Sequence, residues 1–132
     1  MGVRLLLDTH VLLWATLKPE LLPQRLHVQL VDPAHTLILS AATAWELSIK
    51  HRLGKLPEAE PLLAFTDVAR QLGAGVLSIS AAHAVHAGAL DWAHRDPFDR
   101  MLVAQALLEG YRLVTLDDHI RVFAPAPLYD WT

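Results

Sequence analysis

The sequence contains no cysteine among its 132 residues. Disulfide frameworks, thiolate zinc sites, iron–sulfur clusters and cysteine nucleophiles are therefore excluded, and any metal ion must bind to oxygen or imidazole ligands. Positive charge is also scarce, since 11 Lys and Arg residues stand against 14 Asp and Glu residues, for a net charge of −3. Any contact with nucleic acid must therefore be local or mediated by a metal.

An uninterrupted apolar stretch of membrane-spanning length is missing too. The longest run without Asp, Glu, Lys or Arg, residues 71–90, is broken by glycines and polar side chains. The N-terminus offers only a run of three leucines before Asp8, which is far short of a secretory signal. We therefore expect a cytoplasmic protein without a membrane segment.

The composition is that of a folded domain. Hydrophobic residues make up 53% of the chain and charged residues 19%, which excludes intrinsic disorder. The length predicts one domain over residues 1–132. A mean hydropathy of +0.30 is high for a small soluble domain and indicates that part of the surface is buried against a partner.

Short apolar segments alternate with segments of helical periodicity. Strands are predicted at residues 3–7, 36–40, 76–79 and 111–116, and the tail 124–132 is expected to add an edge strand. Helices are predicted at residues 10–16, 19–31, 41–53, 62–72, 81–92, 96–110 and 118–123. This order predicts a three-layer α/β/α sandwich with a mainly parallel sheet of four to five strands.

Four acidic residues occupy positions where a ligand crevice is expected. Asp8 and Asp117 each follow a predicted strand directly, Glu46 lies in the helix after the second strand, and Asp99 opens the helix before the fourth. The carboxyl ends of parallel strands border the crevice, so the four side chains meet there if the first and fourth strands are neighbours. Such a cluster repels itself unless a hard cation binds, which predicts Mg²⁺ or Mn²⁺.

Helix capping is an alternative explanation for most of these acids. Asp8 can cap the helix that follows it, and Asp96, with Asp99 three residues later, forms a capping pattern in which Asp96 is the N-cap. Asp117 and Asp118 compete for one role, and whichever lies outside the site caps the last helix.

Glu46 is explained less well by local structure. It interrupts an apolar run, and its alternative role is an ion pair with Lys50 one turn later. Such a pair contributes only about 0.2–0.5 kcal/mol. We therefore place Glu46 in the site.

Four motifs in order along the chain carry a resemblance to a known family. They are LDTH at 7–10, SAATAWE at 40–46, DPFDR at 96–100 and LVTLD at 113–117. Together they resemble the PIN-domain family, specifically the single-domain toxins of VapBC-type toxin–antitoxin pairs. The resemblance implies a metal-dependent endoribonuclease, a homodimer, and an antitoxin protein that silences the enzyme through a segment laid over the early helices.

The resemblance also implies roles for individual residues. Its acidic catalytic quartet corresponds to Asp8, Glu46, Asp99 and Asp117, with Asp8, Asp99 and Asp117 as metal ligands. Thr115 matches a small hydroxyl residue near the metal, and the weaker supporting candidates are Thr9 and Ser40. The expected cation lowers the pKa of a bound water and offsets charge on phosphate oxygens, so no protein nucleophile is required.

A local basic patch is expected to attract RNA phosphates. Its members are Lys50 and Arg52 at one helix end and Arg95 and Arg100 on either side of Asp99. Each of them taken alone is also explained as ordinary solvated charge or compensation of a helix dipole.

Two other classes of function remain as alternatives. An aspartate-based phosphoryl-transfer or phosphatase domain would require a second Asp two residues after Asp8, where this chain has His10. It would also require a Lys at the end of the fourth strand, and the sequence has none there. A non-catalytic binding module would use the acids only as helix caps.

Overall fold

The computed structural model describes residues 2–132. Its centre is a parallel sheet of four strands in the order β3-β2-β1-β4. The strands are β1 (Arg4–Leu7), β2 (Thr36–Ser40), β3 (Gly75–Leu77) and β4 (Arg112–Val114). The predicted sheet and its parallel pairing are confirmed.

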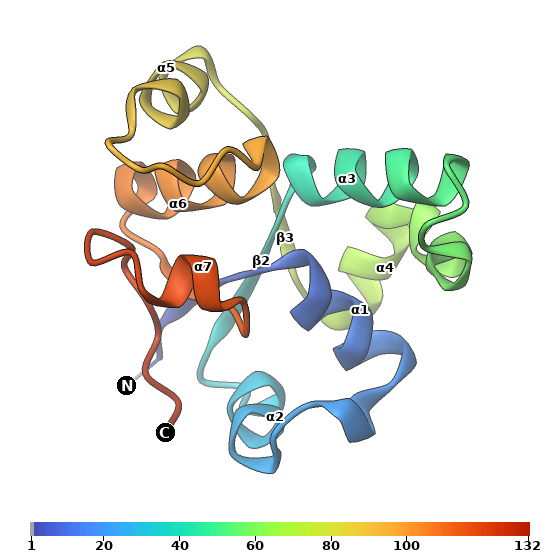
Figure 1. Ribbon diagram of the computed structural model, residues 1–132. Coiled ribbons are helices and arrows are strands. Elements are labelled where there is room, and N and C mark those ends of the chain that lie inside the picture. Colours follow the sequence, from blue (N-terminus) through green and yellow to red (C-terminus); the bar gives the residue numbers. More distant parts are fainter. Residues whose placement is uncertain (1) are drawn as a thin grey trace.

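Helices cover both faces of this sheet (Figure 1). They are α1 (Thr9–Leu17), α2 (Gln24–Val31), α3 (Ala41–Arg52), α4 (Phe65–Leu72), α5 (Ala81–Ala89), α6 (Pro97–Glu109) and α7 (Asp118–Arg121), with 3₁₀ helices η1 (Pro19–Leu21) and η2 (Pro57–Leu63). No helix within residues 2–132 is long and apolar enough to cross a membrane.

The strand β1 is apolar from Leu5 to Leu7 because both of its faces are buried there. Leu5 and Leu7 pack into the cluster shared with α1, α2, α3 and α4, whereas Leu6 points to the opposite side. There it packs with Leu102 of α6 and Ile120 of α7. The result is the three-layer α/β/α sandwich that the sequence predicts.

Two predicted helices are shorter than expected because prolines interrupt them. The segment 19–31 is divided into η1 and α2, since Leu22 adopts extended backbone angles before Pro23. The segment 62–72 begins instead as η2, which contains Pro61, and becomes α-helical only at Phe65.

The C-terminal tail follows the outer edge of β4. Leu113 pairs with Leu128 through an isolated parallel bridge, in which Leu113 N donates to Pro127 O at 2.8 Å and Tyr129 N donates to Leu113 O at 2.9 Å. The Tyr129 hydroxyl donates to Gln29 Oε1 on α2 at 2.6 Å. The expected fifth strand is therefore reduced to one bridge, which fastens the tail across the sheet edge.

Candidate active site

Asp8 lies at the carboxyl end of β1 and is the N-cap of α1. Its Oδ1 accepts a hydrogen bond from the backbone N–H of Thr9 at 2.6 Å, and its Oδ2 accepts one from the Thr115 hydroxyl at 2.6 Å. Only 4% of the residue is exposed, and this burial raises the pKa of Asp8 against the two hydrogen bonds. The Asp8 side chain therefore caps α1 and also belongs to the predicted acidic site.

Glu46 projects from α3 and is 4% exposed. Its Oε1 accepts a hydrogen bond from the Thr9 hydroxyl at 2.6 Å, and its Oε2 pairs with Lys50 Nζ at 2.5 Å. Burial disfavours the charged form of Lys50, but the hydrogen bond and the charge of Glu46 outweigh it and raise the pKa of Lys50. The structure contains the ion pair between Glu46 and Lys50 that the sequence suggests as an alternative role. Thr9 also links Glu46 to Asp8, because its hydroxyl donates to Glu46 and its backbone N–H donates to Asp8.

Asp99 lies in the first turn of α6 and is 7% exposed. Its Oδ2 is hydrogen-bonded to His94 Nε2 at 2.7 Å. Burial, together with the negative charges of Asp96, Asp8 and Asp117, raises the pKa of Asp99 to about 7, although the contact with His94 opposes the shift. The carboxyl is thus poised to lose a proton when positive charge arrives.

Asp117 follows β4 and is the N-cap of α7. Its Oδ1 accepts a hydrogen bond from the backbone N–H of His119 at 2.8 Å and lies 3.2 Å from His119 Nδ1. The backbone N–H of Asp117 donates to the Thr115 hydroxyl at 3.0 Å. Thr115 therefore links Asp8 and Asp117. The expectation that the acid outside the site caps the last helix is wrong, because Asp117, a predicted site residue, is itself the cap.

The strand order explains why these acids meet. β4 lies beside β1 on the side away from β2, so the winding direction reverses between β1 and β4. The charge of Glu46 acts on Asp8, and the charges of Asp8 and Asp117 act on Asp99. The structure therefore brings the four predicted acids, which lie on separate elements, into one electrostatic neighbourhood.

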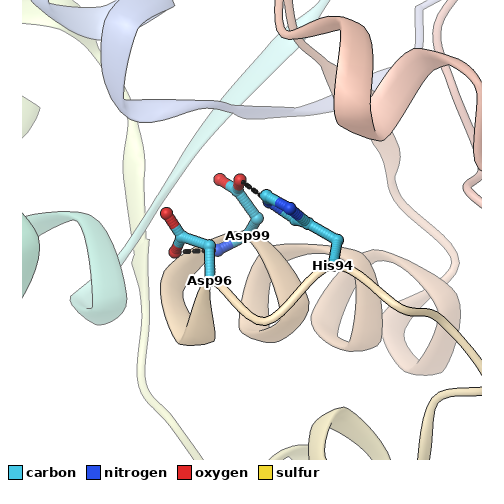
Figure 2. Close-up of side chains that lie close together, drawn as sticks. All are labelled: His94, Asp96 and Asp99. Atoms are coloured by element: carbon cyan, nitrogen blue, oxygen red, sulfur yellow. Dashed lines mark hydrogen bonds and ion pairs between the residues drawn. The ribbon is translucent and has the colours of Figure 1, made fainter.

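The tightest group of potential metal ligands differs from the predicted trio. One ligand atom each of His94, Asp96 and Asp99 lies within 4.8 Å of the others (Figure 2). Asp96 caps α6 as predicted, accepting hydrogen bonds from Phe98 N at 2.9 Å and Asp99 N at 3.2 Å. The sequence motifs do not single out His94, although its position two residues before Asp96 is a signal available in the sequence.

Ser40 makes its hydrogen bonds to residues other than these acids. Its hydroxyl accepts a hydrogen bond from Ala42 N at 3.0 Å, which caps α3, and donates to the buried Gln105 Oε1 at 2.6 Å. Its contacts are those of a residue that joins β2 and α3 to α6. These hydrogen bonds give Ser40 a structural role, and its support of the metal site stays a prediction.

Arg100 is also occupied by a structural task. Its five N–H donor positions contact five backbone carbonyls, those of Ala87, Gly88, Leu90, Trp92 and His94, at 2.7–3.3 Å. The guanidinium group fixes the irregular segment that follows α5 and carries His94. We therefore remove Arg100 from the expected RNA-binding set, whereas Arg52 and Arg95 are exposed and Lys50 is partly exposed.

The side chains of the site fit a hard divalent cation. Burial first, and then the negative charges of Asp96, Asp8 and Asp117, raise the pKa of Asp99 to about 7, so a cation bound among these carboxylates would offset unfavourable negative charge. Oxygen donors of this kind suit Mg²⁺ and Mn²⁺.

Comparison with known proteins identifies the family. The pattern that defines the PIN domain matches residues 5–124. Ribonuclease VapC22 of Mycobacterium tuberculosis (strain ATCC 25618 / H37Rv) is 30% identical over 130 residues, or 96% of this chain and 97% of that protein. Ribonuclease VapC16 of the same strain is 45% identical over 56 residues, or 42% of this chain and 40% of that protein.

A solved structure has the same fold. A chain in the crystal structure of VapBC2 from Rickettsia felis, bound to a DNA fragment from their promoter, matches with a TM-score of 0.70 and 18% identity over 98% of this chain and 100% of that chain. The pattern match, the full-length relative and the shared fold agree with the four sequence motifs. The chain therefore belongs to the PIN domain family and groups there with VapC-type relatives.

Proposed function

We propose that this chain, acting as one PIN domain over residues 1–132, is the endoribonuclease toxin of a toxin–antitoxin pair. The observation that supports the proposal is the charge of Glu46 acting on Asp8, and the charges of Asp8 and Asp117 acting on Asp99, beside the carboxyl ends of the neighbouring strands β1 and β4. The names of the relatives VapC16 and VapC22, both ribonucleases, support the same activity.

Asp8, Asp99 and Asp117 would hold Mg²⁺ or Mn²⁺ in this enzyme. When bound, the cation supplies a Lewis acid that lowers the pKa of water and offsets charge on the phosphate. Thr115 fixes Asp8, and Thr9 fixes Glu46, so both carboxylates are oriented before substrate arrives. Because the pKa of Asp99 is about 7 without a cation, we expect binding to release a proton from this carboxyl.

The partners that we propose are an RNA substrate, a cognate antitoxin and a second copy of the chain, in the cytoplasm. A groove of about 330 Å³ between α1, η2 and α4 supports the proposal that an antitoxin binds. It is lined largely by apolar side chains, including Leu17, Leu62, Val68 and Leu72. The groove borders the early helix α1 and fits the apolar face of a partner segment.

The decisive experiment is sequencing of RNA ends after brief induction in a heterologous host, combined with cleavage of the identified RNA by purified protein in Mg²⁺, Mn²⁺ or EDTA. We expect specific ends with the natural chain and none with Asp8→Asn. Asp67→Asn, which changes an exposed acid on α4, is the matched control and should cut normally. Cleavage that survives Asp8→Asn or EDTA would contradict the proposal.

A further inference from the structure

Four aromatic rings form a row next to the acidic site. Phe123 stacks on Trp92 with ring centres 4.5 Å apart and planes 9° apart, and Trp92 lies 4.9 Å from His94 at 45°. His94 stacks on His119 at 4.6 Å and 13°. The row therefore joins the segment between α5 and α6 to α7 and the residues around it.

The outer end of the row lies beside two of the proposed metal ligands. His94 Nε2 is 2.7 Å from Asp99 Oδ2, and His119 Nδ1 is 3.2 Å from Asp117 Oδ1. The His119 side chain is 71% exposed, whereas the rings of Trp92, His94 and Phe123 are partly buried. The three inner rings thus support a fourth ring whose surface is largely open to solvent.

An open ring face that is held by stacked neighbours is a suitable platform for a nucleobase. Single-stranded RNA presents unstacked bases, and proteins bind them on aromatic side chains because every base has a flat π face. Stacking does not require positive charge, which matters for a chain with a net charge of −3. Bases paired within a duplex are not accessible in this way.

We infer that His119 stacks against an unpaired base next to the phosphodiester bond that is cut. The inference rests on the proposed ribonuclease function and assigns a base-binding residue to the same site. In this arrangement Trp92 and Phe123 are positioning residues, because they hold His94 and through it the ring of His119.

Two substitutions separate stacking from the contact with Asp117. His119→Phe keeps an aromatic face but loses the side-chain contact with Asp117, whereas His119→Asn keeps a polar side chain and has no ring. Both are made in a Glu46→Gln background, which retains Asp8, Asp99 and Asp117 and suppresses cleavage. His86→Asn on α5 is the matched control for loss of an imidazole away from the row.

The probe is a single-stranded oligouridylate that carries one 2-aminopurine, tested at successive positions in Mn²⁺. We expect His119→Asn to weaken binding about tenfold and to abolish the quenching of 2-aminopurine, while His119→Phe stays within about threefold of the parent and still quenches. The His86→Asn control should match the parent. A complementary duplex should bind less tightly and show no effect of His119→Asn. Thermal unfolding checks that each variant is folded.

Equal binding and quenching by His119→Asn and its parent would overturn the inference, and so would a loss in His119→Phe as large as that in His119→Asn. Either result leaves the proposed function intact if the natural chain still cuts RNA in a metal-dependent way. If the natural chain neither binds nor cuts RNA, the proposed function and the inference fail together.

Discussion

The carboxyl group of Asp99 stores unfavourable electrostatic energy in the metal-free protein. In the unfolded chain this group ionises near its ordinary value of 3.8, and in the folded chain its pKa is about 7. Between these values the folded state binds more protons than the unfolded state. The contribution of Asp99 to the free energy of unfolding is therefore largest at low pH and is lost as the pH rises through 7.

Asp99→Asn should consequently raise the melting temperature of the metal-free protein near neutral pH and flatten its pH dependence, because a neutral amide replaces the repelled carboxylate. We expect a gain of about 1 kcal/mol near pH 8 and loss of RNA cleavage. Thermal unfolding in EDTA at about pH 5 and about pH 8 measures the gain in stability. The control is Asp91→Asn, which changes an exposed acid. A destabilised variant that still cuts RNA would show that Asp99 is structural.

Thr115 is a second residue whose contribution can be measured. Thr115→Val removes the hydroxyl that donates to Asp8 and accepts from Asp117 N, so a buried carboxylate oxygen loses its partner. We expect a loss of about 1–3 kcal/mol in the free energy of unfolding and weaker Mn²⁺ binding, because the pKa of Asp8 rises further. Urea unfolding and calorimetry measure these effects. Thr115→Ser keeps the hydroxyl and should restore both; equal behaviour of the two variants would contradict this role.

Position relative to a strand end is enough to single out Asp8 and Asp117, because parallel strands present their carboxyl ends at one edge, but Glu46 and Asp99 lie on helices and need the family motifs as well. It is not enough for His94, whose contact with Asp99 depends on the path of an irregular segment that has no periodicity. It also does not reveal the hydrogen bond of Ser40, the last residue of β2, to the buried Gln105.

At the scale of the element, the conformation of the segment between α5 and α6 depends on the side chain of Arg100. Arg100 is the common donor to its carbonyls, including those of Trp92 and His94. A lysine cannot reproduce this because its ammonium is a single point donor. The segment therefore has a defined conformation although it is neither helix nor strand.

Arg100→Lys should cost at least about 2 kcal/mol in the free energy of unfolding, since several carbonyls lose their partners. Amide hydrogen exchange across residues 88–96 should accelerate more than exchange in β1. Arg95→Ala, which removes an exposed neighbour, is the control and should change stability by no more than about 0.5 kcal/mol. Unchanged exchange in Arg100→Lys would show that the segment is held by other interactions.

Element boundaries are predictable where a chemical signal marks them. Gly110 ends α6 in the left-handed conformation with φ of 71°, as the sequence indicates, and Ser40 and Ser80 cap their helices. The start of α4 is not predictable, because Leu62 and Phe65 are both buried and continue the apolar pattern across the 3₁₀ turn. Packing, rather than periodicity, decides where that helix begins.

For the molecule as a whole, net charge opposes the binding of RNA. Lys50→Ala combined with Arg52→Ala should weaken RNA binding and reduce the slope of log affinity against log salt by up to about 1.4, because each phosphate that a cation neutralises on a single strand adds about 0.7 to that slope. Filter binding across a salt series measures the slope. Lys18→Ala with Arg70→Ala is a control of equal charge on other surfaces. An unchanged slope would remove Lys50 and Arg52 from the substrate path.

The pairing of the first strand with the last has a consequence for biosynthesis. The hydrogen bond between Thr115 and Asp8 spans 107 positions of the chain, so it forms only after the chain through β4 has left the ribosome. A partly translated product has Asp8 and Glu46 but lacks the strand that brings Asp117 to them. The proposed catalytic group is therefore complete only after Asp117 has emerged, and a product that stops before β4 does not carry it.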